Sequence, residues 1–123
     1  AGSPGGANFG WNVTEGRHCY QDSSCDQRPF ILPIAEYSHD GGNCSVTGGT
    51  VYRGSAMRDL VGIYVMADYC SGRVFTLNVD EGTTTPKQVA QTDAAITSFG
   101  TTEDGEIYAT DQSGGTLLHV ALP

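Results

Sequence analysis

The chain has 123 residues, of which 38% are hydrophobic, so it is long enough for one ordinary domain with a core. Six basic against fourteen acidic residues give a net charge of -8, which argues against binding to nucleic acid phosphates or to an anionic membrane surface. No stretch approaches the roughly 20 apolar residues of a membrane-spanning helix, so we expect no membrane span. The chain opens with AGSPGG and without an initiator methionine, which is typical of a processed or excised piece.

Short β-rich runs bounded by glycine, aspartate, asparagine or serine account for most of the chain. No segment sustains the helical spacing of apolar residues beyond a turn or two, and 17 glycines interrupt the sequence. The predicted strands cover residues 46–53, 62–68, 73–78, 87–91, 96–99, 106–110 and 116–121. Asp104-Gly105 is a strong signal for a hairpin turn just before one of them. The sequence therefore predicts an all-β fold.

One pattern occurs twice along the chain. Asp68 is followed by Gly72 and an apolar run, and Asp111 is followed at the same spacing by Gly115 and another apolar run. A period of roughly 40 residues with about four short strands is typical of a β-propeller blade. The alternative is a single antiparallel sandwich containing two similar hairpins. We expect each aspartate to accept backbone N–H bonds in its own hairpin, which is a structural role.

An interpretation as propeller blades also implies that the chain has packing partners. A single blade cannot bury both of its faces, so two blades need either the rest of a propeller or further copies of the same chain.

The four cysteines, Cys19, Cys25, Cys44 and Cys70, contain no Cys-x-x-Cys pair, which weakens the zinc and thioredoxin-type interpretations. Two disulfides in an oxidising compartment fit better, so we expect an extracellular or periplasmic protein. Proximity alone favours Cys19 with Cys25 and Cys44 with Cys70. The other two pairings stay open.

Other polar groups have structural interpretations that outweigh the functional ones. His39 beside Asp40 has the composition of a general base with an orienting carboxylate, but a histidine in a turn is the simpler interpretation. Oxygen-rich turns at 40–43, 80–82, 103–106 and 111–115 lack the alternating acidic residues of an EF-type calcium loop. Two glycosylation sequons, at 12–14 and 43–45, apply only in a eukaryotic secretory pathway.

Several segments in the same order resemble the C-terminal third of the soluble glucose/sorbosone dehydrogenase family. They are NFGWNVTEG (8–16), EYSH (36–39), CSVTGGTVYRG (44–54), GIYVMADYCSGRVFTL (62–77) and ITSFGTTEDGEIYATDQSGG (96–115). The resemblance covers nearly the whole chain and is weakest in VDEGTTTPKQ. It implies about two to three blades of a six-bladed propeller, with 1–43 leading into a blade and holding a disulfide loop, 44–91 forming one blade, and 92–123 forming the strands of the last blade.

The resemblance also implies chemistry. Many members use pyrroloquinoline quinone (PQQ) and calcium to oxidise aldose sugars, whereas the related propeller of the hedgehog-interacting protein is not an enzyme. Tyr69 and Arg73 fall where the family presents loops to its central channel, and Arg73 is the better candidate for an anion contact.

The chain departs from the family where the cofactor is bound. The lysine that the resemblance places after the second strand falls on or beside Cys70, and the expected paired arginines fall in TDAAITSFG, which has no basic residue. The family's catalytic histidine and calcium loop lie upstream of these segments. An anionic cofactor buried without counter-charges is costly. The sequence thus leaves three functions open: a segment of a PQQ-dependent aldose dehydrogenase, a non-catalytic binding propeller, or a self-assembling structural subunit.

Overall fold

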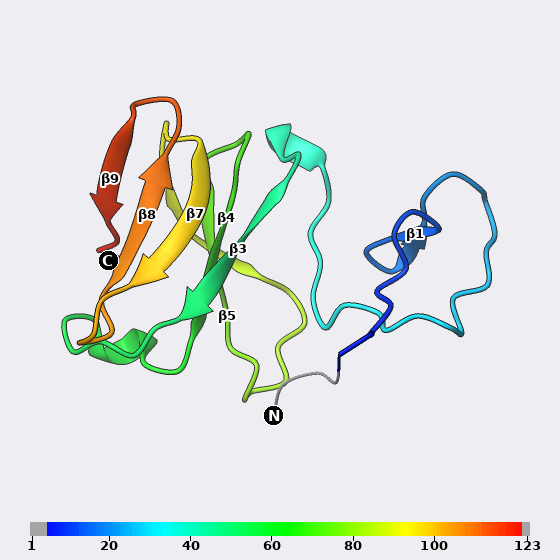
Figure 1. Ribbon diagram of the computed structural model, residues 1–123, viewed down its shortest axis with the longest axis horizontal. Coiled ribbons are helices and arrows are strands. Elements are labelled where there is room, and N and C mark those ends of the chain that lie inside the picture. Colours follow the sequence, from blue (N-terminus) through cyan, green and yellow to red (C-terminus); the bar gives the residue numbers. More distant parts are fainter. Residues whose placement is uncertain (1–4, 122–123) are drawn as a thin grey trace. The chain divides into compact units, whose positions relative to one another are not determined.

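The computed structural model describes residues 5–121, which fall into two compact units, 1–36 and 37–123. Figure 1 follows the chain from the first unit into the strands of the second. No helix in the described residues is long and apolar enough to cross a membrane.

The first unit is largely irregular. Its regular structure is a two-stranded antiparallel pair, β1 (Thr14–Glu15) and β2 (His18–Cys19). The guanidinium of Arg17 donates to the carbonyl oxygens of Pro33 (3.1 Å) and Ile34 (3.0 Å), which holds the returning chain against the hairpin. Neither strand was predicted from the sequence, because two residues are too few to produce an alternating pattern.

The second unit consists of two antiparallel sheets whose strands are ordered as they follow one another in the chain. The first contains β3 (Val46–Val51), β4 (Tyr64–Asp68), β5 (Arg73–Leu77) and β6 (Lys87–Gln91). The second contains β7 (Ile96–Thr101), β8 (Ile107–Asp111) and β9 (Thr116–His119). Short 3₁₀ turns lie at Asp40–Gly42 and Arg58–Leu60. The predicted all-β fold is confirmed. The described strands of this unit form two open sheets and no closed ring.

The core of this unit lies between the two sheets. Val65 and Ala67 of β4 face Ile107 and Ala109 of β8, and all four are almost completely buried. β3 and β7 run beside one another where the sheets meet (Figure 1), and the Thr47 hydroxyl donates to the Ile96 carbonyl oxygen at 2.6 Å. Full burial of a valine or isoleucine side chain stabilises the folded state by about 1.5–3 kcal/mol. The apolar layer that the two sheets share therefore holds them together.

A second set of hydrogen bonds joins the two sheets at their opposite ends. The Tyr52 hydroxyl lies 2.9 and 3.0 Å from the two carboxylate oxygens of Glu106, which also accepts the N–H groups of Ser55 and Ala56. The Glu106 carboxylate therefore fastens the loop after β3 to the start of β8.

The hairpin between β7 and β8 differs in type from a two-residue Asp-Gly turn. Gly105 N–H donates to the Thr102 carbonyl, and Thr102 N–H donates to the Glu106 carbonyl, both at 3.0 Å. Gly105 has φ 85°, whereas no non-glycine residue in the described part of the chain has a positive φ. This is a three-residue loop in which glycine alone takes the left-handed conformation.

Candidate functional site

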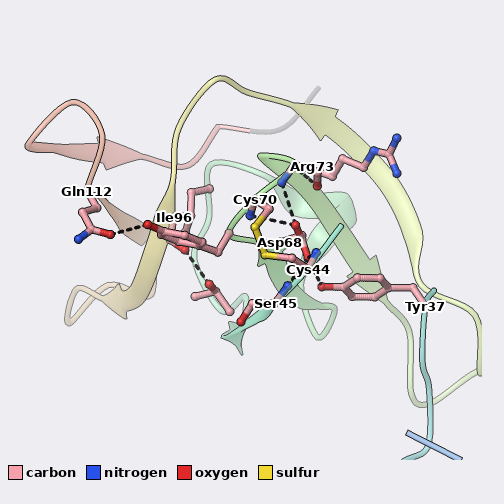
Figure 2. Close-up of a disulfide and its surroundings, with 11 residues drawn as sticks. Tyr37, Cys44, Ser45, Asp68, Cys70, Arg73, Ile96 and Gln112 are labelled. Carbon is pink, nitrogen blue, oxygen red and sulfur yellow. Dashed lines mark hydrogen bonds between the residues drawn. A yellow bond between two sulfur atoms is a disulfide. The ribbon is translucent and has the colours of Figure 1, made fainter. Parts of the chain in front are cut away.

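Asp68, the last residue of β4, is the centre of a polar cluster. Its side chain is fully buried and accepts five hydrogen bonds. Oδ2 accepts from the Tyr37 hydroxyl (2.9 Å) and from the N–H groups of Cys44 and Ser45 (3.0 Å each), and Oδ1 accepts from the N–H groups of Cys70 (3.0 Å) and Ser71 (2.8 Å). Figure 2 shows Tyr37 and the 44–45 segment converging on this carboxylate. The two remote segments and the turn after β4 are thus held by one side chain.

The Cys44–Cys70 disulfide lies directly beside that carboxylate (Figure 2), with 5.6 Å between the two Cα atoms. Both half-cystines donate their backbone N–H groups to Asp68, so the carboxylate and the covalent bond hold the same two stretches of backbone. The other pair, Cys19 and Cys25, closes a loop in the first unit.

Asp111 repeats this arrangement in the second sheet. Its carboxylate accepts from Ala95 N–H at 3.0 Å, just before β7, and from Ser113 and Gly114 N–H at 2.9 Å in its own turn. Ala95 and Ser45 are equivalent, since each residue also accepts the N–H of the residue that follows its aspartate. Each aspartate therefore fastens the start of the first strand of its sheet to the turn after the second strand.

The two copies differ in the hydroxyl group that each aspartate accepts. Asp68 receives Tyr37, whose ring stacks on Phe75 with the ring centroids 4.9 Å apart. Asp111 instead receives the hydroxyl of Ser113, at 2.6 Å, from within its own turn. Asp68 is fully buried and receives a hydroxyl from 31 residues away, whereas Asp111 is partly exposed and receives its hydroxyl from its own turn.

Both carboxylates are held in the ionised form. Burial alone would raise the pKa of Asp68, but the N–H of Ser71, the hydroxyl of Tyr37 and the N–H groups of Cys44 and Ser45 outweigh it and lower that pKa. The Ser113 hydroxyl, followed by the backbone donors, lowers the pKa of Asp111. Burial and the adjoining Asp68 charge raise the pKa of Tyr37. These groups are saturated acceptors and donors, which is unlike a general acid or base near neutrality.

The two residues expected to face a channel lie at the same end of the sheets, which we call the aspartate-turn end (residues 38–45, 68–73, 92–95 and 111–115). Tyr69 donates its hydroxyl to Gln112 Oε1 at 2.7 Å. Arg73 donates through Nη1 to the Asp40 carbonyl (3.4 Å) and to Asn43 Oδ1 (3.3 Å). The Arg73 guanidinium thus supports the 3₁₀ turn.

This end does not fit an anionic quinone or a calcium ion. Arg73 already contacts the turn, His39 is the other basic side chain of this end, and Asp40, Asp93 and Asp111 of the adjoining segments are acidic. A calcium ligand needs carboxylate lone pairs directed at the ion, but those of Asp68 and Asp111 are directed at N–H and O–H donors. Within residues 5–121, no group of three or more His, Cys, Asp or Glu side chains is placed to hold a metal.

His39 and Asp40 lie at the first 3₁₀ turn, and a histidine in a turn is the interpretation that the sequence favoured over a general base. Asp40 accepts the Ser38 hydroxyl at 2.7 Å, and His39 begins the 3₁₀ turn. Sequence reasoning missed Tyr37 and Glu106. Their only sequence signal was a tyrosine and a glutamate in otherwise strand-like or loop-like stretches, and the groups that they contact lie 31 to 54 residues away.

Comparison with known proteins gives distant relatives among the curated proteins. No protein-family model matches the chain, and no solved structure matches it. It is 27% identical over 125 residues to the HIPL1 protein of Arabidopsis thaliana, in an alignment that covers 92% of this chain and 17% of that protein. The chain therefore spans about a sixth of the relative that it matches, and at this identity it is related to that protein only distantly.

Proposed function

We propose that residues 44–91 and 92–123 are two consecutive blades of an extracellular β-propeller related to the glucose/sorbosone dehydrogenases, with 1–43 leading into the first blade. The two chain-ordered antiparallel sheets, the repeated aspartate turns and the distant similarity to the HIPL1 protein support this assignment. The two disulfides support an oxidising, extracellular location.

Within that propeller, the role of this segment is architectural and not catalytic. The observation that carries this proposal is that Asp68 and Asp111 of the aspartate-turn end have both carboxylate oxygens engaged by backbone and hydroxyl donors. Such groups fix loops, because their carboxylate oxygens are directed at N–H and O–H donors of the chain and not at a metal or a substrate. Any PQQ- and calcium-dependent aldose oxidation by a longer protein would rest on residues outside 1–123.

A quinone titration tests the proposal directly. The chain is titrated with PQQ, with and without calcium, and binding is followed by equilibrium dialysis. No saturable binding is expected, because the aspartate-turn end is acidic and its single guanidinium is engaged. Saturable binding that Arg73→Gln weakens, and that Arg17→Gln in the first unit leaves unchanged, would overturn it.

The partner of the two blades is a separate question. Val46 and Leu117 are more than half exposed, so each sheet offers apolar surface to a neighbour. We propose that the neighbours are the other blades of the same propeller. Sedimentation at micromolar protein should then give a monomer, whereas a discrete trimer would favour three chains closing a six-bladed ring.

A further inference from the structure

The chain contains two N-glycosylation sequons, Asn12-Val13-Thr14 and Asn43-Cys44-Ser45. We propose that Asn12 carries an N-linked oligosaccharide and that Asn43 does not. This rests on the extracellular location proposed above and on passage of the chain through a eukaryotic secretory pathway; a curated relative of the chain is a plant protein. It does not depend on the blade assignment.

Asn12 is open to modification. It is exposed, and within the described part of the chain no hydrogen bond engages its side-chain amide. Its neighbours Trp11, 68% exposed, and Val13, 45% exposed, also face solvent. An oligosaccharide on Nδ2 would therefore displace no packed group. It would also add a hydrated group beside the exposed ring pair of Trp11 and Tyr20, whose centroids are 4.6 Å apart.

Asn43 is closed to modification. Its side chain is 8% exposed, and Nδ2, the atom that would carry the sugar, donates to the Ser38 carbonyl at 3.0 Å. Oδ1 accepts from Arg73 at 3.3 Å. The middle residue of the sequon, Cys44, is bonded to Cys70, and the N–H groups of Cys44 and Ser45 both donate to Asp68. A sugar at Asn43 would have to break this buried network.

The oligosaccharide must be transferred to Asn12 before the chain folds. In the transfer, Nδ2 of Asn12 forms a bond to the anomeric carbon of a lipid-diphosphate-linked oligosaccharide, the bond from that carbon to the diphosphate breaks, and the amide loses one proton. The transfer enzyme must also reach the hydroxyl of Thr14, but in the folded protein Thr14 is only 3% exposed, and its hydroxyl makes no hydrogen bond within the described residues. The loop is therefore modified while the chain is still unfolded. After folding, a sugar on Asn12 can remain in solvent, whereas a sugar on Asn43 could not.

The experiment expresses the full chain behind a cleavable secretory leader in eukaryotic cells. The secreted protein is treated with a peptide N-glycosidase, which removes the sugar and converts an occupied asparagine to aspartate, and its peptides are mapped by mass. The expected result is a mass loss on treatment, with aspartate at position 12 and unchanged asparagine at 43. Asn43→Gln should show the same mass loss as the parent.

Two variants remove the site at Asn12. Asn12→Gln should be secreted without sugar. Thr14→Val keeps Asn12, removes the sequon, and replaces a buried, unbonded hydroxyl by a methyl group of similar size, so it should also lack sugar and be at least as stable. A glycan found on Asn43, or a secreted parent chain without a glycan on Asn12, would overturn the proposal. If a variant is not secreted, the peptide map of the parent chain decides alone.

Discussion

The Tyr69 hydroxyl donates to Gln112 Oε1 at 2.7 Å, and the two residues are 43 positions apart in the sequence. Each of them directly follows the aspartate of its own turn, so the hydrogen bond joins equivalent positions of the two copies. The two turns that repeat in the sequence therefore also lie beside one another in the structure.

This contact predicts measurable coupling between the two turns. Tyr69→Phe and Gln112→Leu each remove one partner, and a double-mutant cycle on the free energy of unfolding should give about 0.5–1.5 kcal/mol, the usual net value of one hydrogen bond. Tyr20→Phe is the control, since the hydroxyl of Tyr20 makes no hydrogen bond within the described residues. A coupling energy of zero would mean that the two turns are not held together in solution.

The two aspartates should differ in their contribution to stability. Asp68→Asn puts an amide nitrogen where an oxygen now faces at least two donors, whichever way the amide turns. Each buried donor left without an acceptor costs roughly 1–3 kcal/mol. In Asp111→Asn the amide can instead replace Oδ2, which faces one backbone donor near solvent, so the loss should be smaller. Urea unfolding measures both, and equal losses would contradict the buried role of Asp68.

Stability should fall in acid. The pKa values of Asp68, Asp111 and Glu106 lie below their ordinary values of 3.8 and 4.5, and for Glu106 the leading cause is the Ala56 N–H. Because the folded pKa is lower than the unfolded one, their stabilisation is complete above the ordinary values and is lost as pH falls through the folded values. Urea midpoints recorded from neutral pH downward should decline below about pH 4.5. Glu106→Gln should decline less steeply, and a flat profile in the parent chain would refute the expectation.

The bulge in β3 should tolerate alanine at one glycine but not at its neighbour. Thr47 pairs with Ala67 and Thr50 with Val65, so Gly48 and Gly49 lie together opposite Met66. A Cβ on Gly49 would collide with the Val65 carbonyl group, which is backbone and cannot turn away, whereas a Cβ on Gly48 meets only the Tyr64 hydroxyl at 3.8 Å. Gly49→Ala should therefore cost about 1–3 kcal/mol or more by overpacking.

Gly48→Ala is the matched control for that variant and should change the thermal midpoint little. If the two variants melt at the same temperature, the bulge is not as close to β4 as the contact requires.

Local patterns in the sequence were enough for the all-β class and for the strands of the second unit. Runs such as YVMAD and RVFTL are apolar, β-rich and bounded by Asp and Gly, and their bounds agree with the structure to within two residues. The turn roles of the two aspartates are also local, since each accepts N–H groups two and three residues ahead.

The rest could not be predicted because it depends on distant segments. Tyr37 and Cys44 contact Asp68 from 31 and 24 residues away, and no residue pattern near Asp68 distinguishes its buried carboxylate from the more open one of Asp111. Glu106 likewise looks like part of a turn, and only the folded chain places Tyr52 and the 55–56 backbone against it. The resemblance made Arg73 a weak candidate for an anion contact, with a surface role favoured, and its contacts with Asp40 and Asn43 follow from the path of the 38–45 segment.

The Cys44–Cys70 bond also decides how this protein would carry tension. It joins Cys44, two residues before β3, to the turn after β4, so a pull along the chain passes through the sulfur atoms and bypasses both strands. The bypassed stretch has a sequence separation of 26, which corresponds to about 90 Å of extended chain at about 3.5 Å per residue. In an oxidising medium the disulfide prevents a pulling force from extending this stretch. After reduction the same force can unfold β3 and β4 and lengthen the chain.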